Sequence, residues 1–149
     1  MSEDAAGMPI VHLLRALTVS LNLSAARFAA DNGMHPTDLR AVIDLLDAER
    51  AGVAATPGWL GESLGLNSAS VTALLDRLER LGHVRRERDA TDRRRVRLVV
   101  TPAAKQLGWA YFGPLIGGLL DTMKGYRDDE LAVVHRFLSD AAGVAGAPS

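Results

Sequence analysis

The sequence predicts a mainly α-helical protein with a small β wing, and two observations lead to this fold class. Apolar residues recur at helical spacing over most of the chain, whereas the alternation typical of strands is confined to a stretch near residues 84–101. With 149 residues, 48% of them hydrophobic, the chain can bury one sizeable core. We therefore expect a winged helix-turn-helix lobe flanked by helices at both ends.

Two helices are expected in the first third of the chain. Residues 8–31 place apolar side chains at steps compatible with one helical face, and the sequence DNG at 31–33 ends that helix. Pro36 suits the first turn of a second helix, whose apolar positions are Leu39, Val42, Ile43 and Leu46. The small-residue link AGVAA at 51–55 then leaves room for a short strand.

A helix-turn-helix is predicted next. Thr56 caps a short third helix that ends at Gly65, and Asn67 caps a fourth helix that ends at Gly82. The apolar stripe of the fourth helix consists of Val71, Leu74, Leu75, Leu78 and Leu81. Two short helices joined by a tight turn that contains glycine are the helix-turn-helix arrangement.

A hairpin and two further helices complete the predicted chain. The strands VRRER and RVRLVVT flank the polar turn DATDRR, where Asp89 and Asp92 are turn formers, and this hairpin forms the wing. A long helix follows from Thr101, with a kink expected at Pro114, and Asp128 is expected to cap a last helix. The long helix is apolar on most sides, which is typical of an interface.

The charge distribution indicates a localised site for a polyanion. The net charge is only −1, but residues 67–101 hold nine Arg against five Asp or Glu, so this segment is basic within an acidic chain. The absence of cysteine excludes disulfides and thiol chemistry. No two of the four histidines are spaced to share a metal on one helix face, so we expect no metal and no cofactor.

The first residues and the apolar stretches of the sequence indicate where in the cell the protein is found. Residues 1–7 lack the pattern of a signal peptide, and the longest apolar stretch, at 109–120, is too short to span a bilayer. We therefore expect a cytoplasmic protein without membrane association.

The order of elements, with the motif SVT-x-LLDRLE-x-x-G-x-V-x-R and then D-x-x-DRR, resembles the MarR family of bacterial transcriptional regulators. The resemblance covers about residues 8–142, and 57–101 is its distinctive part. It implies a homodimer with intertwined outer helices and two winged-helix lobes on palindromic double-stranded DNA. Many members are repressors released by small aromatic ligands, so it also implies an effector of that kind. We interpret 1–149 as a single domain, with dimerisation helices at 8–35 and 102–142 and a DNA-binding lobe at 36–101.

The fourth helix is the candidate recognition helix. Helix N–H groups and small side chains at its start suit contact with phosphates and base edges. The predicted DNA-binding residues here are Ser68, Ala69, Ser70, Thr72, Ala73 and Arg77, with Arg77 as a longer arm for phosphate. The family often has a basic residue where this chain has Ala73, so base readout is expected to shift toward the thymine methyl group and the wing. Considered alone, the helix could equally be an ordinary surface helix with a Ser-rich cap.

Three adjacent arginines, Arg93, Arg94 and Arg95, complete the predicted DNA-binding set. A narrow A·T-rich minor groove concentrates negative potential and attracts arginine. The resemblance implies that one of the three enters this groove while an Asp of the wing holds another in place, and the sequence leaves open which is which. The alternative is a solvated charged turn. Arginines of the first strand either contact phosphate or pair with neighbouring acids.

Two other functions compete with sequence-specific DNA binding, a general binding module and a hydrolase. A winged helix can serve as a protein-interaction or non-specific DNA-coating module without operator selectivity. The segment GESLG at 61–65 matches the G-x-S-x-G pattern of hydrolases, but that motif requires Ser63 between a strand and a helix of a parallel sheet, which this sequence does not predict. We therefore expect a non-enzymatic, sequence-specific DNA-binding transcriptional regulator, and a repressor rather than an activator.

Overall fold

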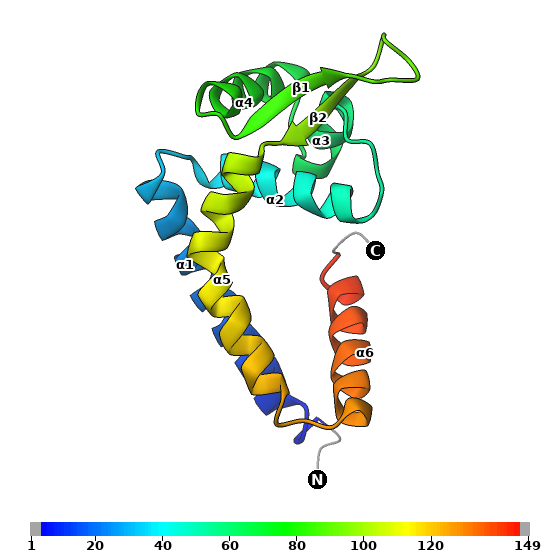
Figure 1. The fold of residues 1–149 in the computed structure, drawn as a ribbon. Coiled ribbons are helices and arrows are strands. Elements are labelled where there is room, and N and C mark those ends of the chain that lie inside the picture. The colour runs from blue at the N-terminus through cyan, green and yellow to red at the C-terminus, as the bar shows by residue number, and fades with distance from the viewer. Residues whose placement is uncertain (1–3, 147–149) are drawn as a thin grey trace. The chain divides into compact units, whose positions relative to one another are not determined.

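The computed structural model describes residues 4–146, which form six helices and one two-stranded hairpin (Figure 1). The elements are α1 (Met8–Asp31), α2 (Pro36–Arg50), α3 (Pro57–Leu64), α4 (Ser68–Arg80), β1 (Val84–Arg88), β2 (Val96–Val100), α5 (Pro102–Met123) and α6 (Asp128–Val144). The predicted fold class, mainly α with a small β wing, is confirmed.

Two compact units divide the chain, one ending at Gln106 and the other beginning at Leu107. The first unit holds α1 to β2 and the first turn of α5, and the second holds the rest of α5 with α6. The division therefore falls inside α5, and the single domain with a DNA-binding lobe that ends at residue 101 stays a prediction.

The core of the first unit is aliphatic. α3 packs against α2, α4 and β2, while α4 also packs against β1. The most deeply buried apolar side chains come from these elements and are Leu60, Val71, Leu74, Leu75, Leu78 and Val84. Full burial of such a side chain contributes about 1.5–3 kcal/mol, so this cluster fixes which face of α4 points inward.

The caps predicted at Thr56 and Asn67 are confirmed, and they position the two helices of the helix-turn-helix. The Thr56 hydroxyl accepts a hydrogen bond from the Trp59 N–H at 3.1 Å, and the Asn67 carboxamide accepts one from the Ser70 N–H at 2.9 Å. Gly65 lies between the two helices with φ of 67°, a left-handed conformation that glycine adopts without a steric cost. The turn can therefore be as tight as the sequence predicts.

Two local expectations differ from the structure. The link at 51–55 forms no strand, and it meets β2 through one bond, from the Leu98 N–H to the Ala55 carbonyl at 2.8 Å. Arg127 rather than Asp128 is the cap residue of α6, because the Arg127 N–H donates to the Glu130 carboxylate at 2.8 Å. α5 includes Pro114 within one continuous helix, and the kink expected there stays a prediction.

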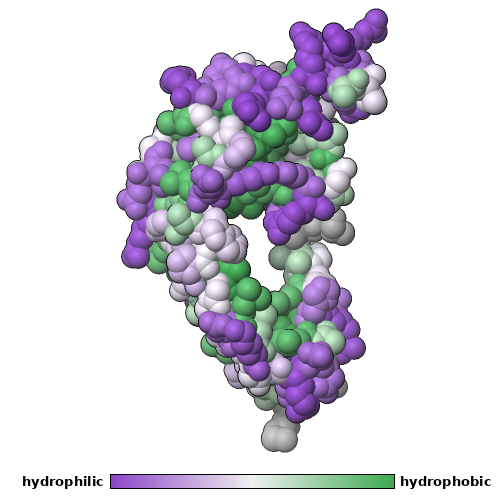
Figure 2. Space-filling model, in the orientation of Figure 1, coloured by the Kyte–Doolittle hydropathy of each residue, from purple (hydrophilic) through white to green (hydrophobic). Residues whose placement is uncertain are grey.

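Apolar surface is abundant on α1, α5 and α6. α6 has no buried residue, and α5 buries only Ala104. Hydrophobic residues reach the surface along the C-terminal helices in Figure 2. The most exposed large apolar side chains of the three helices include Leu13, Leu23, Trp109, Leu120 and Val133, each more than half exposed. The intramolecular core therefore leaves these helices largely uncovered.

α1 is the one helix in residues 4–146 that is long and apolar enough, by length and composition, to cross a membrane. The helix that meets this test is therefore not the one that contains the apolar stretch at 109–120. A single helix of this kind is weak evidence for a membrane span, because the core helix of a soluble protein and a signal sequence pass the same test.

Gly61 provides a test of the contact between α3 and the segment that follows it. A Cβ at this position would lie 3.0 Å from the Leu66 carbonyl oxygen and 3.2 Å from Val71 Cγ2. We expect Gly61→Ala to lower the free energy of unfolding by about 1–3 kcal/mol, measured by urea denaturation, because this added methyl group overpacks the core. Gly58→Ala is the matched control, since its Cβ would meet only the Thr56 hydroxyl at 3.9 Å. Equal losses in both variants would contradict the close approach.

Candidate nucleic-acid interface

The start of α4 presents small and polar side chains to solvent. Ser68, Ala69, Ser70, Thr72 and Ala73, all predicted contact residues, are exposed. The Thr72 hydroxyl donates to the Ser68 carbonyl at 2.9 Å, whereas the Ser68 and Ser70 hydroxyls have no hydrogen-bond partner among residues 4–146. This end of the helix can therefore approach another molecule closely and offer it free hydroxyl groups.

The tip of the hairpin carries three free guanidinium groups. Arg93, Arg94 and Arg95 are exposed, and none of their side chains has a hydrogen bond or ion pair within the described part of the chain. The loop between the strands extends beyond α3 and α4 (Figure 1), and its surface is strongly hydrophilic (Figure 2). Positive charge is thus concentrated at a narrow, accessible tip.

Two aspartates shape that tip, as the sequence predicts. The Asp89 carboxylate accepts from both the Thr91 N–H at 3.1 Å and the Thr91 hydroxyl at 2.9 Å, and the Asp92 carboxylate accepts from the Arg94 N–H at 3.0 Å. The bonds from Thr91, with a smaller contribution from the positive charge of Arg95, lower the pKa of Asp89. Asp89 therefore stays ionised and acts mainly on the loop backbone.

The arginines of the strands are already engaged. Arg86 donates through its N–H and Nη1 to Glu79 at 3.1 and 2.7 Å, and through Nη2 to Asp76 at 3.1 Å, which ties β1 to α4. Arg85 and Arg97 both lie beside Glu87, at 3.5 and 3.4 Å. Arg88, at the end of β1, instead donates through Nη1 to the Arg93 carbonyl at 2.8 Å. Neighbouring acids therefore pair with Arg85, Arg86 and Arg97, and the unpaired arginines of the hairpin lie at its tip and at the adjoining end of β1.

Arg77 was expected to reach a DNA phosphate, but its guanidinium group is bound within the lobe. Its Nη2 and Nε donate to the two carboxylate oxygens of Asp38, at 2.8 and 3.3 Å, and this bonding raises the pKa of Arg77. Asp38 is fully buried. The guanidinium group is therefore held toward α2, because releasing it would leave an unpaired carboxylate in the core. Sequence reasoning missed this pair because the two residues are 39 positions apart.

Ser63 has no hydrolase-like setting. It lies inside α3, and its hydroxyl donates to the Asp44 carboxylate on α2 at 2.7 Å. The two strands within residues 4–146 both belong to the hairpin, so Ser63 does not follow a strand of a parallel sheet. The G-x-S-x-G match therefore reflects the end of a short helix.

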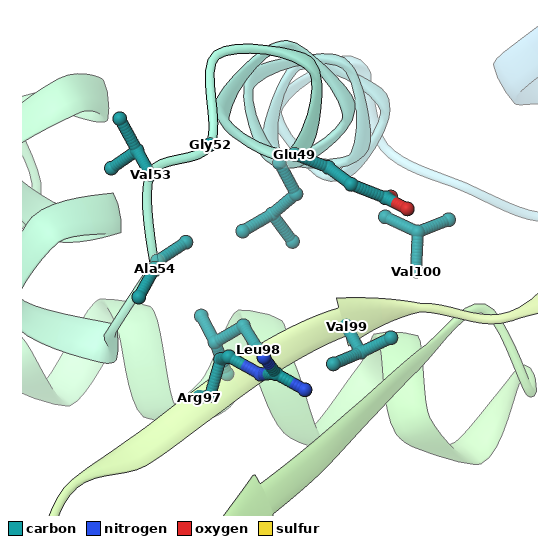
Figure 3. Close-up of a pocket in the computed structure, with 10 residues that line it drawn as sticks. Glu49, Gly52, Val53, Ala54, Arg97, Leu98, Val99 and Val100 are labelled. Atoms are coloured by element: carbon teal, nitrogen blue, oxygen red, sulfur yellow. The ribbon is translucent and has the colours of Figure 1, made fainter. Parts of the chain in front are cut away.

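A hollow of about 280 Å³ lies between the end of α2, the following link and β2 (Figure 3). Leu45, Val53 and Val99 provide apolar walls, and Glu49 and Arg97 are its charged side chains. Glu49 pairs with Lys105 at 2.7 Å. The hollow is lined by β2, and the loop that carries the three unpaired arginines comes directly before this strand.

Together these features define a winged-helix DNA-binding protein: an exposed helix start beside a cationic hairpin, both fixed to one aliphatic core. The sequence profile of the MarR family matches residues 32–95. The uncharacterized HTH-type transcriptional regulator YcgE of Bacillus subtilis (strain 168) is 40% identical over 134 residues, which cover 90% of this chain and 84% of that protein. The chain belongs to the MarR family of transcriptional regulators.

Solved structures share the fold. A mutant of MepR from a multidrug-resistant S. aureus clinical isolate has a TM-score of 0.73 at 17% identity, over 91% of this chain and 96% of that one. A MarR family protein from Bacillus stearothermophilus has a TM-score of 0.67 at 21% identity, over 98% and 99%. The S. aureus MepR–DNA complex has a TM-score of 0.59 at 17% identity, over 91% and 98%.

Proposed function

We propose that this protein is a homodimeric repressor that binds palindromic DNA operators in the cytoplasm. The observation that carries the proposal is the set of three unpaired arginines at the wing tip of a lobe whose α4 also exposes free hydroxyl groups. In the proposal, α4 lies in the major groove and the wing follows the adjacent minor groove. The structure of MepR with DNA supports this arrangement by fold similarity.

The proposed DNA contacts divide by chemistry. Ser68, Ala69, Ser70, Thr72 and Ala73 approach base edges, where hydroxyls bond to several base types and alanine methyl groups meet the thymine methyl. The cationic residues Arg93, Arg94 and Arg95 contact phosphates and the minor groove, which supplies affinity that weakens with salt. Arg77 leaves this set because Asp38 holds its guanidinium group.

The exposed apolar surfaces of α1, α5 and α6 are proposed to form a dimer interface with a second copy of the chain. α6 buries no residue in the single chain, and the large apolar side chains that are exposed on α1, α5 and α6 have relative exposures from 38% to 91%. Soluble monomers rarely expose contiguous apolar surface of this extent. A twofold dimer removes it from water and presents two lobes to half-sites about 34 Å apart.

Selection of bound duplexes from a random pool tests the proposal. We expect enrichment of a palindrome with half-sites about one helical turn apart, and a preference of about 10³–10⁷ over random DNA. Sedimentation of the free protein is expected to give twice the chain mass of 15.9 kDa. A monomer that binds all duplexes equally would support a DNA-coating module instead.

Arg94 at the wing tip gives a single-residue test. Arg94→Ala is expected to weaken operator binding and to reduce the slope of log affinity against log salt by about one, because one phosphate contact is lost. Titrations at several salt concentrations provide the measurement. Arg85→Ala is the matched control, because Arg85 already pairs with Glu87. An unchanged slope and affinity for Arg94→Ala would assign the wing contact to its neighbours.

A small aromatic acid is the proposed effector, and the hollow beside β2 is its proposed site. The ring would lie against Leu45, Val53 and Val99, and the carboxylate would meet Arg97, whose contact with Glu87 is long at 3.4 Å. An effector that favours one wing position would shift the population away from the DNA-binding form. S. aureus MepR has been solved with ethidium bromide, which shows that a protein of this fold takes an aromatic ligand.

A panel of single-ring aromatic acids tests this site. At least one is expected to bind, measured by calorimetry, and to lower operator affinity. Arg97→Gln is expected to abolish this response, while Arg85→Gln, which also lies beside Glu87 but does not line the hollow, is expected to retain it. A response that survives Arg97→Gln would place the effector elsewhere.

A further inference from the structure

Asp38 is the single ionisable side chain that is buried among residues 4–146. Its oxygens accept three hydrogen bonds, from the Arg77 Nη2 at 2.8 Å, from the Arg77 Nε at 3.3 Å and from the His35 N–H at 3.1 Å. Burial of a carboxylate is costly, and a well-packed apolar pair at such a place is often as stable or more stable. The ion pair therefore calls for an explanation other than stability.

The bidentate geometry restrains the rotation of α4. Asp38 lies in the first turn of α2, and Arg77 lies near the end of α4. α3 packs against both α2 and α4, whereas α2 and α4 do not pack extensively against each other in the described part of the chain. The guanidinium group thus spans from one helix to the other, and its two parallel bonds fix an angle that a single contact would leave free.

A second ion pair holds α4 from another direction. Arg86 on β1 binds Glu79 and Asp76 of α4. Asp76 and Arg77 are consecutive, so their side chains leave the helix about 100° apart. The two pairs differ in the burial of the acid: Asp76 and Glu79 are 54% and 35% exposed, whereas Asp38 is 1% exposed, and the arginines are similarly exposed. The bond between Arg77 and Asp38 is therefore the restraint on α4 that cannot be released without leaving an unpaired carboxylate in the core.

We propose that Asp38 and Arg77 are positioning residues that set the orientation of α4 and thereby its selectivity among DNA sequences. This inference rests on the proposed function of α4 in base readout. Hydrogen bonds to base edges require an accurate helix orientation. Attraction of the wing arginines to phosphate is tolerant of small rotations. The pair therefore controls the ratio of operator to random-DNA affinity without touching DNA.

The test compares Asp38→Asn, Arg77→Gln and the double variant in the full-length protein. Affinities for the selected operator and for a random duplex are measured across salt concentrations, together with urea unfolding. Asp38→Asn keeps every arginine but turns an amide N–H toward the guanidinium group. We expect it to lower the ratio of operator affinity to random-duplex affinity, which is about 10³–10⁷ in the wild type, by about tenfold or more. Random-duplex affinity and the salt slope are expected to stay unchanged in Arg77→Gln.

The double variant separates positioning from simple stabilisation. It removes both charges, so it is expected to recover most of the stability that Arg77→Gln loses by leaving Asp38 unpaired. Operator preference is not expected to return, because the bidentate restraint is still absent. Arg40→Gln is the matched control, since Arg40 is an exposed arginine of α2 that pairs with Asp44 of the same helix. It is expected to keep the full operator preference.

Distinct outcomes would overturn the inference. A salt slope reduced by about one in Arg77→Gln with operator preference intact would make Arg77 a phosphate ligand. Recovery of preference together with stability in the double variant would make the pair structural only. If Arg77→Gln fails to fold, Asp38→Asn and the double variant still decide. A wild-type protein without operator preference would instead overturn the proposed function, and this inference with it.

Discussion

Burial of one aliphatic stripe of α4 is the constraint on which the described lobe depends. Val71, Leu74, Leu75 and Leu78 are almost inaccessible, and they meet Leu60 and Val84 from the neighbouring elements. Because successive residues of a helix are rotated by about 100°, fixing this stripe decides which residues face solvent. Exposure of the small residues at the start of α4 is therefore a consequence of core packing, and so is the position from which the hairpin begins.

Pairing, rather than the number of arginines, decides where the lobe is positive. Nine arginines lie between residues 67 and 101. Those nearest the core, Arg77 and Arg86, are bound to acids, while those at the hairpin tip are not. Arg77 and Arg86 contribute rigidity because each of them joins two elements. Free arginines contribute long-range attraction, and their position at a narrow tip concentrates it.

Local features of the fold could be predicted, and long-range contacts could not. The caps Thr56 and Asn67, the turn at Gly65 and the hairpin each depend on residues close in sequence, and all are present. The bond between Arg77 and Asp38 joins residues with no shared periodicity, so the exposed-looking Arg77 was expected to reach phosphate. The link at 51–55 failed as a strand because a single bond to β2 does not make a ladder.

Burial within the lobe and burial in the proposed dimer interface act on different parts of DNA recognition. The lobe has its own core, so the orientation of α4 is decided within one subunit by side chains such as Leu78 and Asp38. The apolar surfaces of α5 and α6 have no such cover, and in the proposed dimer they become a second core shared by two chains. Within-lobe packing then governs which bases a half-site must contain. The shared core governs how far apart two half-sites must lie, so changes in one need not disturb the other.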